Sequence, residues 1–271
     1  MYLIIGLSIN FIIIFIIVFT LEKNKFRLID GYNKLKLPDD LSYCRDIPLL
    51  SLEEAYFLGY LYGLVNNPSD LVGAMILKWI KEDKIVLKDN GVNASIDMNK
   101  AVKFNNRFER KIYFKLLASS GSNYILEEKE FINFFKTDEI INLFGNMLKH
   151  VEYTFLQKGL YKKIVFGTEY KYYLDKSLKE KAYQLAGLKN FLLDFSKIND
   201  RKGQEVSLWE DYLIYAQLMG IADKVEVQFE NIYPDYNKFM KISVINNTIL
   251  ISLLSTLKFL PLLFISGQSK K

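Results

Sequence analysis

The chain has 271 residues and a formal net charge of +5, but residues 22–241 hold 33 basic and 31 acidic side chains, a net charge of only +2. This near balance argues against a broad nucleic-acid surface, which needs concentrated positive charge. Cys44 and His150 are the only residues of their types, which excludes an internal disulfide and leaves no zinc-ligand spacing.

Residues 2–21 form an uncharged run in which 15 of 20 residues are Leu, Ile, Val or Phe. As a helix, this run matches the roughly 30 Å hydrocarbon core of a bilayer, so we predict a transmembrane helix. A cleaved signal peptide is the alternative, but no basic residue precedes the run and no small-residue cleavage site ends it. Lys23, Lys25 and Arg27 follow the run, which places residues 22–241 in the cytoplasm by the positive-inside rule.

Residues 242–265 form a second apolar run, interrupted by Lys258 and Pro261. We expect a second transmembrane helix here, with an interfacial or partner-packed helix as the alternative. The composition, rich in Lys, Ile, Asn and Tyr, is typical of AT-rich bacterial genes. The sequence therefore predicts an integral protein of a bacterial plasma membrane that contacts lipid through both runs.

Residues 22–50 are interpreted as a juxtamembrane connector. Its proline-containing end favours extended backbone, since the residue before a proline avoids the helical region. Polar side chains in such a segment commonly bind a domain face or a partner. We expect a latch that ties the connector to the first folded domain, with a ligand site as the alternative; the candidate residues are Tyr43, Arg45, Asp46 and Pro48.

Helix starts are signalled at four positions. Three have the capping-box pattern, in which a Ser and the Glu three residues later satisfy each other's backbone N–H: Ser51–Glu54, Ser177–Glu180 and Ser207–Glu210. The fourth is Asn67-Pro68, a capping residue followed by a proline suited to the first helical position.

Two stretches of helices followed by a hairpin predict winged-helix-like domains at 51–103 and 104–176. The first has helices at 52–62 and 68–82 and strands at 84–88 and 94–98, joined by an Asn-Gly turn. The second has helices at 105–117, 127–135 and 138–157 and strands at 161–166 and 169–174.

A helical pair is predicted at 177–241, with helices at 178–195 and 208–229. Trp209 and Tyr212 lie on the apolar stripe of the second helix and are further candidate partner or latch residues, with burial in the core as the alternative. The expected fold class is mainly α with small β-hairpins (α+β), flanked by transmembrane helices.

Two motifs resemble a family of predicted bacterial membrane proteins known as domain of unknown function 2207. The first runs from Tyr43 to Pro48 and continues through Ser51–Ala55 and Asp70–Leu77; the second is Leu208–Ala216, continued by Gly220–Val225. The resemblance spans residues 38–265 and implies a helix-rich cytoplasmic region between transmembrane helices. Family members usually carry a signal sequence and an extracytoplasmic β domain before that region. The chain shows neither, which is expected of a reduced member or a fragment. The resemblance implies no activity.

No catalytic, cofactor-binding or metal-binding residues are expected. Glu210 and Asp211 resemble an acid/base pair, but acidic residues at a helix start are explained by capping and by the helix dipole. We predict a non-enzymatic module that binds an unidentified protein. The alternative, a membrane-tethered winged-helix transcription regulator, is disfavoured because the chain holds only five arginines. An enzyme would require a concave pocket with convergent titratable groups.

Overall fold

The computed structural model describes residues 35–65, 67–89, 94–135, 138–166, 169–195 and 208–232. Both predicted transmembrane runs, 2–21 and 242–265, lie outside these ranges. Across the ranges that are described, no helix combines the length and apolar character needed to cross a bilayer. The described part is mainly helical with two small antiparallel sheets, as expected for the α+β class.

The first two helices are α2 (Leu52–Tyr62) and α3 (Pro68–Lys81). The capping box before α2 is confirmed, because the Ser51 hydroxyl accepts from the Glu54 N–H at 3.2 Å and the Glu54 carboxylate accepts from the Ser51 N–H at 3.0 Å. Pro68 begins α3 as predicted, although the Asn67 side chain makes no capping hydrogen bond.

A three-stranded sheet follows, built from β1 (Val86–Asp89), β2 (Ala94–Asp97) and β3 (Ile125–Glu127) in the order β1-β2-β3. The hairpin of β1 and β2 confirms the sequence prediction, whereas β3 was not predicted. Ile96 lies opposite Leu87 on one side and Leu126 on the other. The sheet therefore joins residues from both sides of the boundary that the sequence suggested at position 103.

The next elements are α4 (Arg107–Ser119), a short 3-10 turn (Gly121–Asn123), α5 (Glu128–Phe135) and α6 (Asp138–Gln157). Helix α4 begins two residues later than predicted because Asn106 caps it: its side-chain oxygen accepts from the N–H groups of Phe108 and Glu109 at 2.7 and 3.0 Å. Helix α6 and the hairpin of β4 (Tyr161–Phe166) and β5 (Glu169–Leu174) have the predicted bounds.

Three helices complete the described part: α7 (Lys176–Leu193), α8 (Trp209–Leu218) and α9 (Ala222–Ile232). The predicted capping box at Ser177 is wrong, because Asp175 caps α7 by accepting from the Ser177 N–H at 2.8 Å. The single helix predicted over 208–229 is also wrong: Gly220, with φ of 67°, separates α8 from α9. Ser207 of the third predicted capping box lies outside the described residues.

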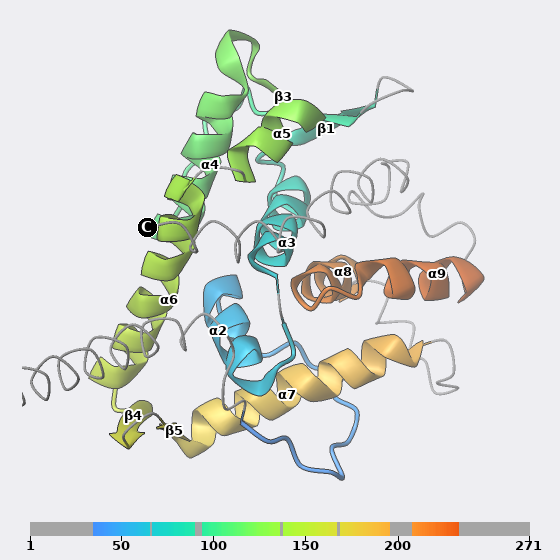
Figure 1. Cartoon of the computed structure of the whole chain (residues 1–271). Helices are drawn as coiled ribbons and strands as arrows, with labels where there is room; N and C mark the ends of the chain where they lie inside the picture. Colours follow the sequence, from blue (N-terminus) through green and yellow to red (C-terminus); the bar gives the residue numbers. More distant parts are fainter. Residues whose placement is uncertain are drawn as a thin grey trace, which may run out of the picture.

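Helix α2 lies at the centre of the molecule, between α6, α3 and α7, and α3 packs along α8 (Figure 1). A continuous core extends through all these elements. One aromatic group in this core includes Trp79, whose ring lies edge-on to Phe104 and Tyr113 with centroids 5.6 and 5.5 Å away. The connector, in blue, passes across α7 before entering α2 (Figure 1).

Candidate functional site

The connector is attached to α7 through two of the predicted candidate residues. The Tyr43 hydroxyl donates to Asp194 Oδ2 at 2.9 Å, just past the end of α7. The Arg45 guanidinium carbon lies 5.6 Å from the centroid of the Phe191 ring, a cation–π distance. A hydrogen bond from Tyr43 and a cation–π contact from Arg45 thus bind the connector to the C-terminal end of α7.

Helix α8 contacts the same segment through two tyrosine hydroxyls. The Tyr212 hydroxyl donates to the Arg45 carbonyl oxygen at 3.1 Å, and the Tyr215 hydroxyl donates to the Pro48 carbonyl oxygen at 3.3 Å. Burial raises the pKa of Tyr215 to about 12, with the charges of Asp211 and Glu54 acting in the same direction. The Tyr215 hydroxyl therefore keeps its proton and its donor role at neutral pH.

A glycine allows the backbone of the connector to lie close to α7. A Cβ added at Gly187 would lie 2.7 Å from the Ser42 carbonyl oxygen and 2.9 Å from Cys44 Cβ. We call this contact region the connector clamp, and its residues are Tyr43, Arg45, Pro48, Gly187, Tyr212 and Tyr215. The clamp ties the connector to α7 and α8, whereas the sequence suggested the first folded domain as its target.

Two candidate residues lie elsewhere. Asp46 is exposed, and its carbonyl oxygen accepts from the Cys44 thiol at a sulfur–oxygen distance of 3.6 Å. Trp209 is 2% exposed and stacks on Phe229, with centroids 4.6 Å apart and planes 16° from parallel. Trp209 therefore belongs to the core between α8 and α9, while Tyr212 belongs to the clamp.

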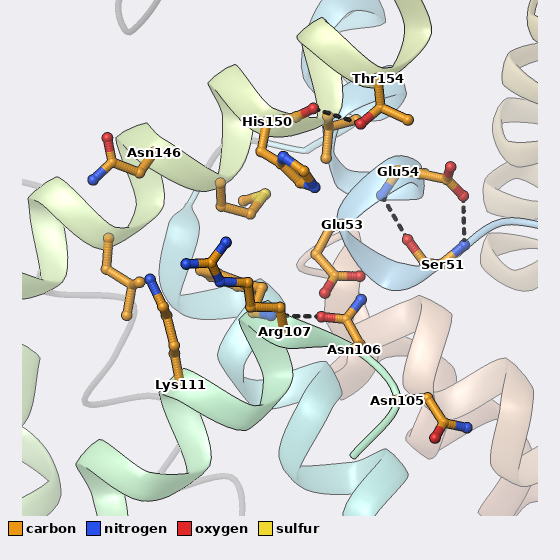
Figure 2. A pocket seen from close by; sticks show the side chains of 14 residues that line it. Ser51, Glu53, Glu54, Asn105, Asn106, Arg107, Lys111, Asn146, His150 and Thr154 are labelled. Atoms are coloured by element: carbon orange, nitrogen blue, oxygen red, sulfur yellow. Dashed lines mark hydrogen bonds between the residues drawn. The ribbon is translucent and has the colours of Figure 1, made fainter. Parts of the chain in front are cut away.

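A pocket of about 620 Å³ opens between the start of α2, the start of α4 and the middle of α6 (Figure 2). Glu53, in the first turn of α2, forms part of its wall and is only 2% exposed. Neither carboxylate oxygen of Glu53 has a hydrogen-bond partner among the described residues. A buried ionisable group without a partner is costly, so it marks a place where a ligand can supply the missing contact.

The surroundings of Glu53 favour its neutral form. Burial raises its pKa, and the nearby Glu109 carboxylate raises it further. The Glu53 backbone lowers the pKa with an effect second only to that of burial, and the Ser51 hydroxyl and the Lys78 ammonium lower it less. Glu109 itself is paired: it forms an ion pair with Lys78, and its other oxygen accepts from the Trp79 indole at 3.3 Å.

Basic side chains occupy the other wall. Arg107 and Lys111, one turn apart on α4, and His150 on α6 all line the pocket and are exposed. In Figure 2 the His150 ring points toward the middle of the pocket, the Glu53 carboxylate lies beside Asn106, and the Arg107 guanidinium extends to the side away from Glu53. The floor is apolar, formed by the side chains of Phe108, Leu143, Met147 and Val151.

The sequence reasoning missed this pocket because it treated Glu53 as an ordinary acid at a helix start. One signal was available: the residues three and four positions later, Tyr56 and Phe57, are large and apolar, so Glu53 lies on the buried face of its helix. Among the residues that the structure describes, no group of three His, Cys, Asp or Glu side chains is arranged to hold a metal ion.

Residues 165–229 match the family described as "Predicted membrane protein (DUF2207) C-terminal domain". The matched segment begins at the end of β4, contains β5, α7 and α8, and ends within α9, so it includes the α7 and α8 sides of the connector clamp. It also includes the motif Leu208–Ala216 that suggested this family, while the resemblance over residues 38–164 and 230–265 stays a prediction. No curated protein and no solved structure matches the chain.

Proposed function

We propose that the chain is a membrane-anchored module that binds another protein and catalyses no reaction of its own. In this proposal, residues 2–21 and 242–265 cross a bacterial plasma membrane, and residues 22–241 face the cytoplasm. The uncharged run at 2–21, its basic flank and the match to a predicted membrane protein domain support the anchoring.

The observation that carries the binding role is a group of exposed apolar side chains at one end of the molecule. We call it the α6–hairpin surface, formed by Tyr153, Leu156, Ile164 and Tyr173, which are 59%, 41%, 41% and 49% exposed. Exposed tyrosines and aliphatic side chains gathered in one region are typical of protein interfaces.

The register of the hairpin brings Ile164 and Tyr173 together, while Tyr153 and Leu156 lie on the adjacent helix α6. Tyr173 lies opposite Lys162 in the hairpin, and Lys162 and Ile164 are two residues apart, so Ile164 and Tyr173 lie on the same face. On α6, Glu152 accepts from the Tyr161 hydroxyl at 3.1 Å, so the helix packs on the face of the hairpin that holds Tyr161, and Ile164 and Tyr173 lie on the opposite face. Leu156 follows Glu152 by one turn, and Tyr153 lies three residues before Leu156.

We also propose that residues 104–176 are a winged-helix domain. Its elements follow the order helix, strand, helix, helix and hairpin, namely α4, β3, α5, α6 and β4–β5. One feature is particular to this chain: β3 pairs with β2 of the preceding segment. In this interpretation the α6–hairpin surface combines the third helix of the domain with its wing.

Site-specific photo-crosslinking tests the binding role. A photoreactive residue is placed at Tyr173 or at Ile164 of the full chain in the membranes of its own cells, with Val227 on α9, 56% exposed, as the control position. We expect both test positions to give the same discrete adduct with another protein and Val227 to give none.

Identical adducts at all three positions, or adducts only with the chain itself, would overturn the proposal. The purified full chain is also tested with duplex DNA at low salt. Binding that weakens steeply as salt is added would replace the protein partner with the alternative, a membrane-tethered transcription regulator.

A further inference from the structure

The two walls of the pocket between α2, α4 and α6 favour ligand groups of opposite charge. Glu53 offers two oxygens without partners on one wall, while Arg107 and Lys111 present cations on the other. Neither Arg107 nor Lys111 forms an ion pair with a described residue. We propose that this pocket binds a small zwitterion, whose primary amine bonds to Glu53 and whose anionic group bonds to Arg107 and Lys111.

The isolation of Glu53 is the first support. Two other acids are equally buried: Glu109, paired with Lys78 and Trp79, and Asp70, whose Oδ1 accepts from Gln217 Nε2 at 3.4 Å. Both of these buried acids therefore have partners within the fold, in contrast to Glu53. An amine supplies Glu53 with a charge-assisted donor in a site shielded from water, where such a bond is strongest.

The positive wall is the second support. Arg107 is the first residue of α4, where the helix dipole adds partial positive charge, and Lys111 follows one turn later. A guanidinium binds carboxylates and phosphates through two parallel hydrogen bonds, which fixes the orientation of the anionic group. Because the two walls differ in charge, they also define the orientation of the bound ligand.

The size and floor of the pocket define the rest of the ligand. A volume of about 620 Å³ lies within the range of small-molecule sites. The apolar floor, formed by Phe108, Leu143, Met147 and Val151, suits a hydrocarbon group. An amine, an anion and an apolar part occur together in a free apolar amino acid, and an amine–phosphate pair occurs in a phosphoethanolamine headgroup.

Calorimetry on the full chain in detergent micelles, with four probes, tests the proposal. L-leucine carries all three features, isopentylamine lacks its carboxylate, and 4-methylpentanoate lacks its amine; O-phosphoethanolamine represents the lipid headgroup. We expect L-leucine or O-phosphoethanolamine to bind. Isopentylamine and 4-methylpentanoate should each bind about tenfold or more weakly than L-leucine, because each loses one charged contact. Binding of leucine assigns a free amino acid, and binding of O-phosphoethanolamine alone assigns a headgroup.

Three variants connect the binding to the pocket. Glu53→Gln and Arg107→Gln should each weaken binding about tenfold or more. Arg110→Gln is the matched control, since Arg110 is an exposed arginine of the same helix outside the pocket, and its binding should stay within about twofold. Arg107 is exposed, so its variant tests the site even where the Glu53 variant alters folding.

Absence of binding by both L-leucine and O-phosphoethanolamine would overturn the proposal. Binding that is unchanged in Arg107→Gln, or binding of isopentylamine as tight as that of L-leucine, would do the same. These outcomes are independent of the crosslinking experiment, because the pocket and the α6–hairpin surface have no residue in common.

Discussion

The hydroxyl of Tyr212 donates to the carbonyl oxygen of Arg45 at 3.1 Å, a contact that joins residues 167 positions apart in the sequence. The Tyr212 side chain is fully buried, so its hydroxyl and the carbonyl meet where water is scarce. This phenol on α8 is therefore one of the contacts that fix the path of the connector.

Replacing this phenol tests the connector clamp. Tyr212→Phe removes the hydroxyl and leaves the Arg45 carbonyl without its donor, which should lower the free energy of unfolding by about 1 kcal/mol. Urea denaturation of the full chain in detergent, followed by tryptophan fluorescence, measures the change. Tyr153→Phe is the control: Tyr153 is 59% exposed, and removal of its hydroxyl should leave the free energy of unfolding almost unchanged. Equal effects of the two variants would contradict the contact.

Gly187 is expected to tolerate no side chain. The Cβ of Gly187→Ala would lie 2.7 Å from the Ser42 carbonyl oxygen, a backbone atom that cannot move alone. We expect a loss of about 1–3 kcal/mol and faster reaction of Cys44 with a thiol reagent, because the connector must move off α7. Gly145→Ala, in α6 with nothing within 4 Å of its added Cβ, should instead stabilise the chain by about 0.5–1 kcal/mol. Unchanged Cys44 reactivity in Gly187→Ala would disprove the close approach.

Gly220 separates α8 from α9 with a left-handed backbone. Gly220→Ala should cost about 1–2 kcal/mol from its φ of 67°, and its Cβ would also lie 3.1 Å from Asp70 Oδ2. Gly159→Ala has the same φ of 67° but nothing within 4 Å, so it measures the backbone effect alone. Thermal unfolding should show a larger loss for Gly220→Ala; a loss no greater than that of Gly159→Ala would mean that Asp70 adjusts freely.

Glu53 should make the chain less stable as the pH rises. Its pKa is raised in the folded state, so the folded chain holds this proton more tightly than the unfolded chain. Its contribution to stability is complete below the unfolded pKa of about 4.5 and is lost as the pH rises through the folded value. Besides Glu109 and Lys78, the charged and titratable groups that line the same pocket are Glu54, Arg107, Lys111 and His150.

Glu53→Gln removes this titration without changing the shape of the side chain. The variant should be more stable than the parent chain at pH 7–8, and the difference should shrink as the pH falls toward the unfolded pKa. Urea midpoints measured from pH 4 to pH 8 provide the comparison. A constant difference between the two chains across this range would show that Glu53 titrates like an exposed acid.

The sequence predicted the elements whose signals are local. The capping box at Ser51, the proline at position 68 and the apolar periodicity of α6 each act within one or two turns, and the structure has all three helices. The hairpin of β4 and β5 was equally predictable, because the two strand patterns lie next to each other in the sequence, on either side of Gly167-Thr168.

Features that depend on distant contacts were missed. Strand β3 has only three residues, and its pairing with β2 depends on how α4 packs. The break at Gly220 was hidden because the apolar spacing continues from α8 into α9. The clamp residues Tyr43, Arg45 and Tyr212 were selected from the sequence, but their partners on α7 and α8 lie more than 140 positions from the connector, beyond the reach of local patterns.

The pairing of β3 with β2 also determines where the chain can be divided. A fragment that stops at residue 103 leaves the N–H and C=O groups of Ile96 and the N–H of Met98 facing outward along an open strand, where another copy can add its own strand. Truncations made for expression therefore need to extend past Glu127, so that the sheet keeps its own edge strand and does not recruit one from a neighbour.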